Sequence, residues 1–238
     1  MVCHAHIRSR VNPRLLQAHN DVTAAIYATF GVVYAVILGF MVSQGEEERD
    51  LLAATAVREA ATVAALVRAA DAFGSDTASR VRAAATDYLR SVATEEWQAL
   101  ANDRTVPLTA HAIGRLWQAY LAIQPQGLKQ DAIYRASLEL FASLGQLRHQ
   151  RLSAATDRVS DFLRVILWVG AAFAVAFMWF FGAENRTIQL AFTGMLTSML
   201  ALVLIFIIWL DNPLAGDLGL RPDAFERVLS DLSSTPVR

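Results

Sequence analysis

The sequence predicts an all-α membrane protein with three transmembrane helices, the last two forming a hairpin, and a helical extramembrane domain of about four amphipathic helices. Apolar residues make up 55% of the chain and charged residues 18%, an apolar excess for a globular protein. Three runs of about twenty residues carry no charged side chain, and this length of helix crosses the hydrocarbon core of a bilayer. No alternating apolar and polar run bounded by turns argues for a strand.

The first predicted transmembrane helix covers residues 21–43 and follows a polar, basic tail at 1–20. A signal peptide also combines basic residues with an apolar run near the N-terminus. Its apolar run would be shorter, and a small-residue cleavage site should follow it. Here the uncharged run extends over 22–42 and is followed by Ser-Gln-Gly and three glutamates. These features favour a transmembrane helix.

The second and third predicted transmembrane helices cover residues 162–183 and 187–210. Only 184–186 separate the two apolar runs, and so short a link forces an antiparallel hairpin. Amphipathic indoles favour the membrane–water interface. Tryptophans lie near the ends of these runs, at Trp168, Trp179 and Trp209.

The segment between the first and second transmembrane helices, residues 44–161, is the predicted helical extramembrane domain. Its apolar residues recur every three or four positions, as on one face of a helix. Breaks at 74–75, at 102–103 and at 125–127 divide it into about four amphipathic helices. After the third transmembrane helix, residues 211–238 form a predicted C-terminal polar tail.

Small residues recur along the predicted transmembrane helices, at Gly31, Ala35 and Gly39 in the first, at Gly170 and Ala174 in the second, and at Gly194 and Ser198 in the third. Such residues let helix backbones approach, because lipid offers no hydrophobic drive for helix association. They are therefore candidates for helix packing or for lining a pore. One interpretation places the first helix at a pore or a subunit interface. The other, packing within a single bundle, is favoured because alanine is frequent throughout the chain.

The three apolar runs contain no Asp, Glu, Lys, Arg or His. Charges inside a membrane usually mark proton relays or substrate sites, so this pattern argues against a proton-coupled transporter. It permits a channel gated by an apolar constriction, and equally a bundle that conducts nothing. Glu46, Glu47, Glu48 and Asp50 follow the first run. They could attract cations at a pore mouth, but a solvated helix start is the favoured interpretation.

No pattern indicates catalysis, and the chain is not expected to be an enzyme or to hold a cofactor or metal. It lacks a glycine-rich phosphate loop, a nucleophile elbow and a histidine pair at metal-ligand spacing. Asp87, Glu95 and Glu96 lie on a predicted amphipathic helix, where surface solvation is favoured over acid–base catalysis. The single cysteine, Cys3, excludes a disulfide within the chain. A net charge of −1 gives no electrostatic argument for nucleic acid.

Short motifs in a fixed order resemble those of a bacterial membrane family. The chain has His-Asn-Asp-Val at 19–22, Asp-Asn-Pro-Leu-Ala-Gly at 211–216 and Arg-Pro-Asp-Ala-Phe at 221–225. The motif residues, whose roles are unknown, are Asn20, Tyr34, Glu59, Tyr88, Glu96, Trp97, Arg148, Arg151, Asp211, Pro213, Gly216, Pro222 and Phe225. In their order and spacing over residues 19–232 they resemble the bestrophin-like family, a domain of unknown function.

The resemblance implies an all-helical bacterial membrane protein and no established activity. The family label points to bestrophins, which are oligomeric anion channels, by analogy of fold. Members usually have another membrane helix ahead of the His-Asn segment, so this chain is expected to be a shortened variant or to start at an internal methionine. The leading hypothesis is a homo-oligomer in the lipid bilayer that acts as an ion channel. The alternative is a non-conducting signalling or scaffolding module that binds protein partners through its helical domain.

The topology prediction rests on arginines near the helix ends, because acidic residues contribute little to orientation. The N-terminal tail and the hairpin turn share one side of the membrane, with Arg8, Arg10, Arg14 and Arg186. The other side has Arg49, Arg58, Arg148, Arg151, Arg158, Arg164, Arg221 and Arg227. The positive-inside rule therefore places the helical domain and the C-terminus in the cytoplasm of a bacterial inner membrane.

Overall fold

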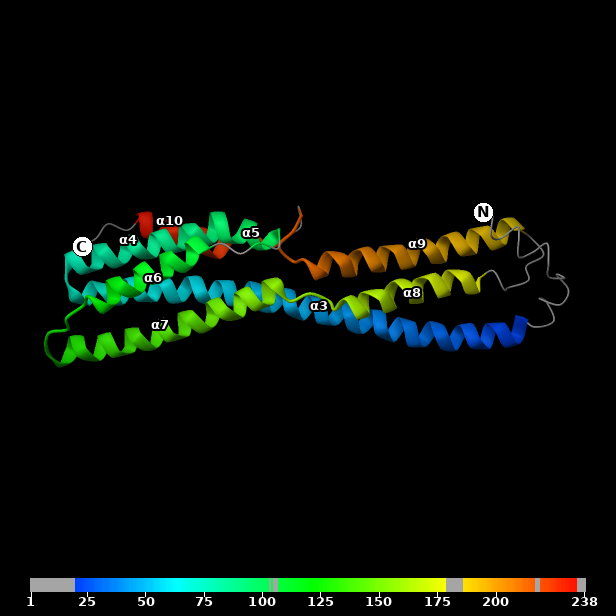
Figure 1. Cartoon of the computed structure of the whole chain (residues 1–238), viewed down its shortest axis with the longest axis horizontal. Coiled ribbons are helices and arrows are strands. Elements are labelled where there is room, and N and C mark those ends of the chain that lie inside the picture. Colours follow the sequence, from blue (N-terminus) through cyan, green and yellow to red (C-terminus); the bar gives the residue numbers. More distant parts are fainter. Residues whose placement is uncertain (1–19, 103, 105–106, 179–185, 217–218, 235–238) are drawn as a thin grey trace. The chain divides into compact units, whose positions relative to one another are not determined.

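The protein is mainly helical in the parts that the computed structural model describes, which are residues 20–102, 104, 107–178, 186–216 and 219–234 (Figure 1). The elements are α3 (Asn20–Ala70), η1 (Asp71–Phe73), α4 (Ser75–Ser91), η2 (Val92–Glu96), α5 (Trp97–Ala101), α6 (Pro107–Leu121), α7 (Gly127–Thr156), α8 (Asp161–Phe177), α9 (Arg186–Asp211) and α10 (Asp223–Ser234). Within those residues there is no strand, so the predicted all-α class is confirmed.

Three helical stretches in the described residues are long and apolar enough to cross a membrane, one each in α3, in α7–α8 and in α9. The three predicted transmembrane helices are therefore confirmed as elements. Helix α3 continues without a break to Ala70, so the first predicted transmembrane helix and the first predicted amphipathic helix are one continuous helix. Trp179 and the turn residues up to 185 lie outside the described residues.

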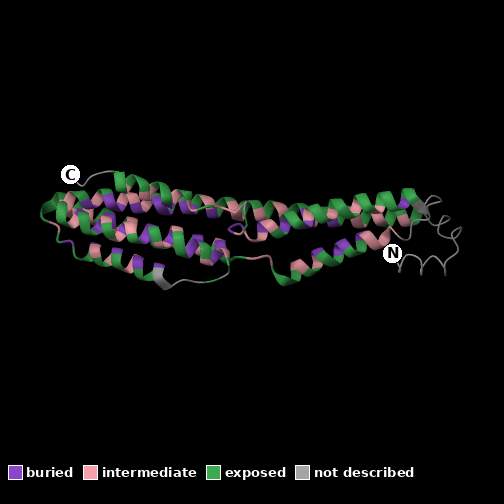
Figure 2. Cartoon of the chain, turned by 90° about the horizontal axis from the view of Figure 1, so that it is seen from above, coloured by how far each residue is buried: buried purple, intermediate pink, exposed green. Residues whose placement is uncertain are grey.

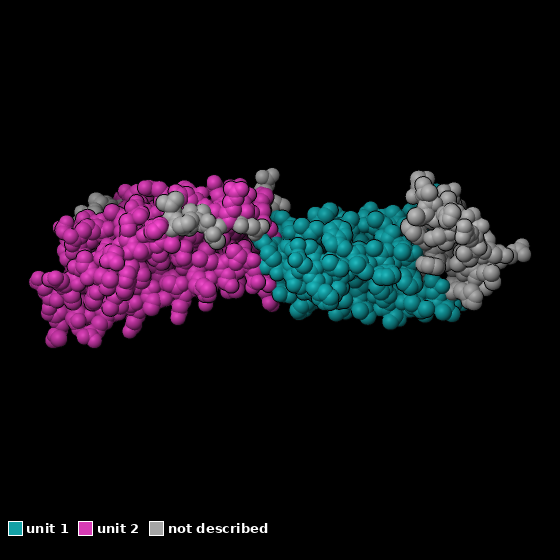
Figure 3. All heavy atoms as spheres, in the orientation of Figure 1, with its two compact units in different colours: residues 1–46, 158–211 teal, residues 47–157, 212–238 magenta. Residues whose placement is uncertain are grey.

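The chain divides into two compact units (Figure 3). Unit 1 comprises residues 1–46 and 158–211, and unit 2 comprises 47–157 and 212–238. Helix α3 contributes its N-terminal part to unit 1 and its C-terminal part to unit 2. Each unit has a hydrophobic core of its own.

Unit 1 consists of the N-terminal part of α3 with α8 and α9. Exposed apolar residues prevail on these helices (Figure 2), as expected for helices whose outer faces meet lipid. Tyr34 on α3 lies close to Gly170 on α8, where a Cβ atom added to the glycine would lie 2.3 Å from the tyrosine ring. The Tyr34 hydroxyl donates a hydrogen bond to the backbone oxygen of Leu167 at 2.6 Å. Close approach at a glycine thus fixes α3 against α8.

Unit 2 is a helical bundle in which the C-terminal part of α3 packs with α4, α6, α7 and α10. Its fully buried side chains include Leu52, Val63, Leu66, Tyr88, Leu89, Leu116, Tyr120, Leu144 and Phe225. Phe225 belongs to α10, inside the segment that was predicted to be only a polar tail. The C-terminal segment therefore completes the core of unit 2.

Candidate functional site

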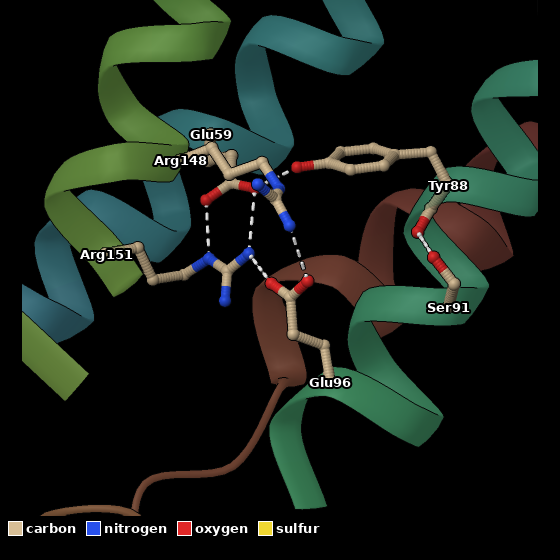
Figure 4. A network of polar contacts seen from close by, with 6 residues as sticks. All are labelled: Glu59, Tyr88, Ser91, Glu96, Arg148 and Arg151. Atoms are coloured by element: carbon tan, nitrogen blue, oxygen red, sulfur yellow. Dashed lines mark hydrogen bonds and ion pairs between the residues drawn. The ribbon is translucent and has the colours of Figure 1, made fainter. Parts of the chain in front are cut away.

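Four charged side chains from three helical segments converge in the interior of unit 2 (Figure 4). Glu59 lies on α3, Glu96 ends η2, and Arg148 and Arg151 lie on α7. Glu59 and Arg151 are fully buried, Glu96 is nearly so, and only Arg148 reaches the surface. Because buried charges are costly unless they are paired, the two carboxylates and two guanidiniums must balance one another.

Arg151 forms the centre of this network. Its Nε donates to Oε2 of Glu59 at 2.6 Å, and its Nη2 donates to Oε1 of Glu59 at 3.2 Å, so the pair is bidentate. The same Nη2 also donates to Oε1 of Glu96. Nη2 of Arg148 donates to Oε2 of Glu96 at 2.8 Å, and the Tyr88 hydroxyl donates to Oε1 of Glu59. The network therefore ties α3, α4, η2 and α7 together by side-chain bonds.

Local helix geometry brings these groups to one place. Arg148 and Arg151 are three residues apart on α7, which puts them on the same face. After α4, the chain makes one π-helical turn, in which the Trp97 amide donates to the Val92 carbonyl oxygen. Regular α-helical spacing would not place residues 92 and 97 on one face, but the extra residue of the π turn does. Consequently Val92, Glu96 and Trp97 are all buried.

The charges of the network outweigh the effect of burial on the pKa values of Glu96 and Arg151. Burial raises the pKa of the Glu96 carboxyl, but Arg151 and Arg148 outweigh this effect, so its pKa lies below the usual value. Burial lowers the pKa of Arg151, but Glu59 and then Glu96 outweigh it, so its pKa is raised. Burial and the Glu59 carboxylate both raise the pKa of Tyr88. At neutral pH, Glu96 and Arg151 are therefore charged and Tyr88 is a neutral donor.

Acid is expected to destabilise unit 2 through Glu96. Because its pKa is lowered in the folded state, its contribution to stability is present above its unfolded pKa, about 4.3, and is lost as the pH falls through the folded pKa. We expect the Tm of the purified protein to fall below about pH 4.3, and to fall less steeply in Glu96→Gln. Glu95→Gln, which changes the exposed neighbour, should keep the wild-type pH slope. The same slope in all three proteins would contradict this assignment.

Aromatic residues enclose the network on the side of α10. The Arg151 guanidinium carbon lies 5.5 Å from the centre of the Phe225 ring, a cation–π arrangement. The rings of Trp97 and Phe225 are 6.0 Å apart at 62°. Nε1 of Trp97 donates to the Leu220 carbonyl oxygen at 2.7 Å. Nη1 of Arg151 is buried without a hydrogen-bond partner among the described residues, so the Phe225 ring is part of what compensates this cation.

The remaining motif residues in the C-terminal half build turns. In unit 1, the Asp211 carboxylate accepts hydrogen bonds from the Val159 amide at 2.6 Å and from Arg164 at 3.1 Å, which joins the end of α9 to the start of α8. In unit 2, the Pro213 carbonyl oxygen accepts from the Leu220 amide at 2.8 Å. Gly216 has a φ of 76°, in the left-handed region that favours glycine.

The last two motif residues lie at helix starts. Pro222 immediately precedes α10, and its carbonyl oxygen accepts from the amides of Phe225 at 2.9 Å and Glu226 at 3.1 Å. Asn20 is the first residue of α3, and its side chain lies outside the described residues.

One interpretation of the sequence is wrong. Glu96 was expected to be solvated on a helix surface, but it is buried in the ion network, while Glu95 is exposed. The small residues of the transmembrane helices were expected to pack within one bundle, and Gly170 lies in such a contact with Tyr34. A Cβ atom added to Gly31, Gly39 or Gly194 would meet nothing within 4 Å in the described chain.

The other small candidates also lack close packing inside the chain. Ala35 on α3 and Ser198 on α9 are exposed. Close approach of helices occurs at Gly170, and also at Gly45, where an added Cβ atom would lie 2.9 Å from Cβ of Leu210. Hence these small residues are available to something outside the chain, either lipid or another copy.

The motif residues that the sequence left without roles are thus mostly parts of one structure. A family model described as a bestrophin-like domain matches residues 1–225. The chain belongs to the bestrophin-like family. Among its motif residues, Glu59, Tyr88, Glu96, Trp97, Arg148, Arg151 and Phe225 all contribute to the buried network or its aromatic cover.

Solved structures share this bestrophin-like fold. One variant of a bacterial bestrophin homologue from Klebsiella pneumoniae has a TM-score of 0.68 and 15% identity, over 89% of this chain and 86% of that chain. Another variant has a TM-score of 0.65 and 14% identity, over 94% and 95%. A crystal structure described only as a membrane protein has a TM-score of 0.65 and 14% identity, over 94% and 97%. At these identities the likeness shows the fold alone. No curated protein matches the chain.

Among the described residues, no group of three or more His, Cys, Asp or Glu side chains is placed to hold a metal ion. The network combines two carboxylates with two guanidiniums, and its ion pairs join α3, η2 and α7.

Proposed function

We propose that this bestrophin-like protein is a homo-oligomeric ion channel of the bacterial inner membrane, with α3 lining the pore. The observation that supports the proposal is an uncovered apolar face on α3. In unit 1, Val32, Val36 and Phe40 are 65%, 67% and 66% exposed. They are spaced four residues apart, so they form one ridge along the helix.

This ridge lies opposite the face that packs against the rest of unit 1. Tyr34, Leu38 and Met41 are the buried residues of α3 in this unit. At about 100° per residue, Val36 lies about 160° around the helix from Tyr34. In a ring of α3 helices backed by their own α8 and α9, the ridge would face the central axis.

The small residues of α3 fit this arrangement as the flank that meets a neighbouring copy. Gly31, Ala35 and Gly39 lie between the packed face and the ridge, and nothing in the described chain covers the two glycines. Small residues permit close approach between helices in a membrane. The flank would therefore form the contact between subunits, and the ridge would form the pore wall.

The ridge is apolar and carries no charge, which suits a constriction that gates by dewetting.

The proposal is tested by cysteine accessibility in reconstituted liposomes. In a Cys3→Ser background, Val36→Cys should make ion flux sensitive to a charged, water-soluble thiol reagent, with severalfold inhibition. Leu202→Cys is the matched control, since this exposed apolar residue lies on α9 away from the ridge. A wild-type protein without flux, or equal modification of both cysteines without effect, would favour the non-conducting module, whose ridge would face lipid.

We also propose that unit 2 and the C-terminus face the cytoplasm. The arginines on that side outnumber those of the N-terminal tail and the hairpin turn, which supports this orientation by the positive-inside rule.

A further inference from the structure

A groove runs between α8 and α9 in unit 1. It consists of two adjoining hollows that share Trp168 and Leu204 in their walls. The larger hollow has a volume of about 370 Å³ and the smaller about 20 Å³. Four of the nine residues that line the larger one are alanines, Ala171, Ala172 and Ala176 on α8 and Ala201 on α9. The alanines leave the space that larger residues would fill.

The apolar lining decides what can fill this groove in a membrane. Water gains few hydrogen bonds there, because the wall of the larger hollow offers Thr197 as its only hydroxyl side chain. A hydrocarbon chain gains dispersion contacts along both walls and loses no hydrogen bonds. The groove therefore suits an acyl chain from the surrounding lipid.

A positively charged side chain lines the smaller hollow. Arg164 lines it together with Val159 and Asp211. The Arg164 side chain is 44% exposed and bridges Asp211 at 3.1 Å and Asp161 at 3.2 Å, and the Asp161 side chain is 95% exposed. An ion pair so exposed contributes little, so a phosphate oxygen could replace Asp161 beside the guanidinium. Trp168, which is half-exposed, adds an indole at this end, where such rings favour the interface.

The length of the groove matches one leaflet. From Arg164 to Ala176, α8 rises about 18 Å at about 1.5 Å per residue. Half of the about 30 Å hydrocarbon core is about 15 Å. A lipid whose phosphate lies at Arg164 would thus extend one acyl chain along the whole groove to the middle of the bilayer.

We propose that the α8–α9 groove is a specific phospholipid site, with the lipid phosphate bound by Arg164 and one acyl chain between the alanine-lined walls. The site belongs to unit 1 and is separate from the α3 ridge, so it does not depend on conduction. It would give the helix pair a fixed lipid partner beside the alanines of both walls.

The test compares lipid retention by matched variants purified in mild detergent. Ala201→Leu fills the groove, whereas Ala191→Leu makes the same change at an exposed alanine of α9 outside it. Phospholipid counted per protomer by native mass spectrometry should fall severalfold in Ala201→Leu and stay at the wild-type level in Ala191→Leu. Equal retention in both would overturn the proposal. So would loss of the oligomer in Ala201→Leu with lipid retention unchanged, because a second copy would then fill the groove.

The phosphate contact is tested by adding defined lipids to delipidated protein. Phosphatidylglycerol should raise the Tm more than diacylglycerol with the same chains in the wild type. In Arg164→Gln the two lipids should act alike, whatever the starting stability of that variant. A preference for phosphatidylglycerol that survives Arg164→Gln would overturn the assignment of the phosphate to this residue.

Discussion

Replacing Arg151 by methionine is expected to destabilise unit 2 by about 3–5 kcal/mol, which is typical when one partner of a buried ion pair is removed. Glu59 would lose its bidentate partner, and Glu96 would keep only Arg148. Methionine preserves much of the apolar volume of the arginine side chain. The loss in free energy of unfolding therefore comes from the uncompensated carboxylates rather than from a cavity. The free energy of unfolding, measured by urea titration of the purified protein in mild detergent, checks the result.

The matched control is Arg135→Met on the same helix. Arg135 pairs with Asp131 one turn away at 2.9 Å, and both side chains are substantially exposed. Removing such a pair is expected to change the free energy of unfolding by about 0.5 kcal/mol or less. A loss below about 1 kcal/mol in Arg151→Met would contradict the network as described, because two buried carboxylates would then tolerate the absence of the cation.

A triple variant separates charge from packing. Glu59→Gln and Glu96→Gln, added to Arg151→Met, remove the charges that Arg151 compensates. Part of the lost stability should return, since a buried amide costs less than a buried carboxylate. The three effects should be strongly non-additive, because the residues share one set of hydrogen bonds.

The network also shows where sequence patterns stop being informative. Charge-free runs of membrane length predicted the transmembrane helices, because the bilayer imposes that length on any one segment. Glu96 was assigned to the surface because carboxylates are usually solvated. Its partner Arg151 lies far along the chain, and no local pattern says that α7 returns to this point. A resemblance of ordered motifs identified most of the network residues but could not say that they touch.

The π turn departs from the helical periodicity on which the sequence analysis relies. Periodicity analysis assumes 3.6 residues per turn, and a single inserted residue shifts every later position. Val92 and Trp97 share the buried face only because η2 takes up the extra residue. The C-terminal helix was missed for a different reason. The apolar positions of α10, such as Phe225 and Leu229, form too short a pattern to stand out in a polar segment.

Substituting Gly170 by alanine is expected to lower the free energy of unfolding of unit 1 by about 1–3 kcal/mol, the usual range for overpacking a close contact. The new methyl group would lie 2.3 Å from Cε2 of Tyr34. Ring carbons cannot approach so closely, so the tyrosine must move. Its hydroxyl would then lose the hydrogen bond to the Leu167 carbonyl oxygen, which is 2.6 Å long.

Gly194→Ala is the matched control, because a Cβ atom there would meet nothing within 4 Å in the described chain. Alanine is a better helix former than glycine, so this variant should be neutral or slightly more stable. Thermal unfolding in detergent, followed by intrinsic fluorescence, compares the two. A similar Tm for both variants would mean that α3 and α8 are not in contact at Tyr34.

Combining Gly170→Ala with Tyr34→Leu tests the cause of the clash. The leucine is smaller than the tyrosine ring, so the added methyl group gains space at the position where the ring lay. The double variant should then be more stable than the sum of the two single changes predicts, which is the coupling expected of residues in direct contact. Additive effects would place the destabilisation elsewhere in the helix pair. Coupling would show that one glycine sets the distance between α8 and the helix whose opposite face carries Val32, Val36 and Phe40.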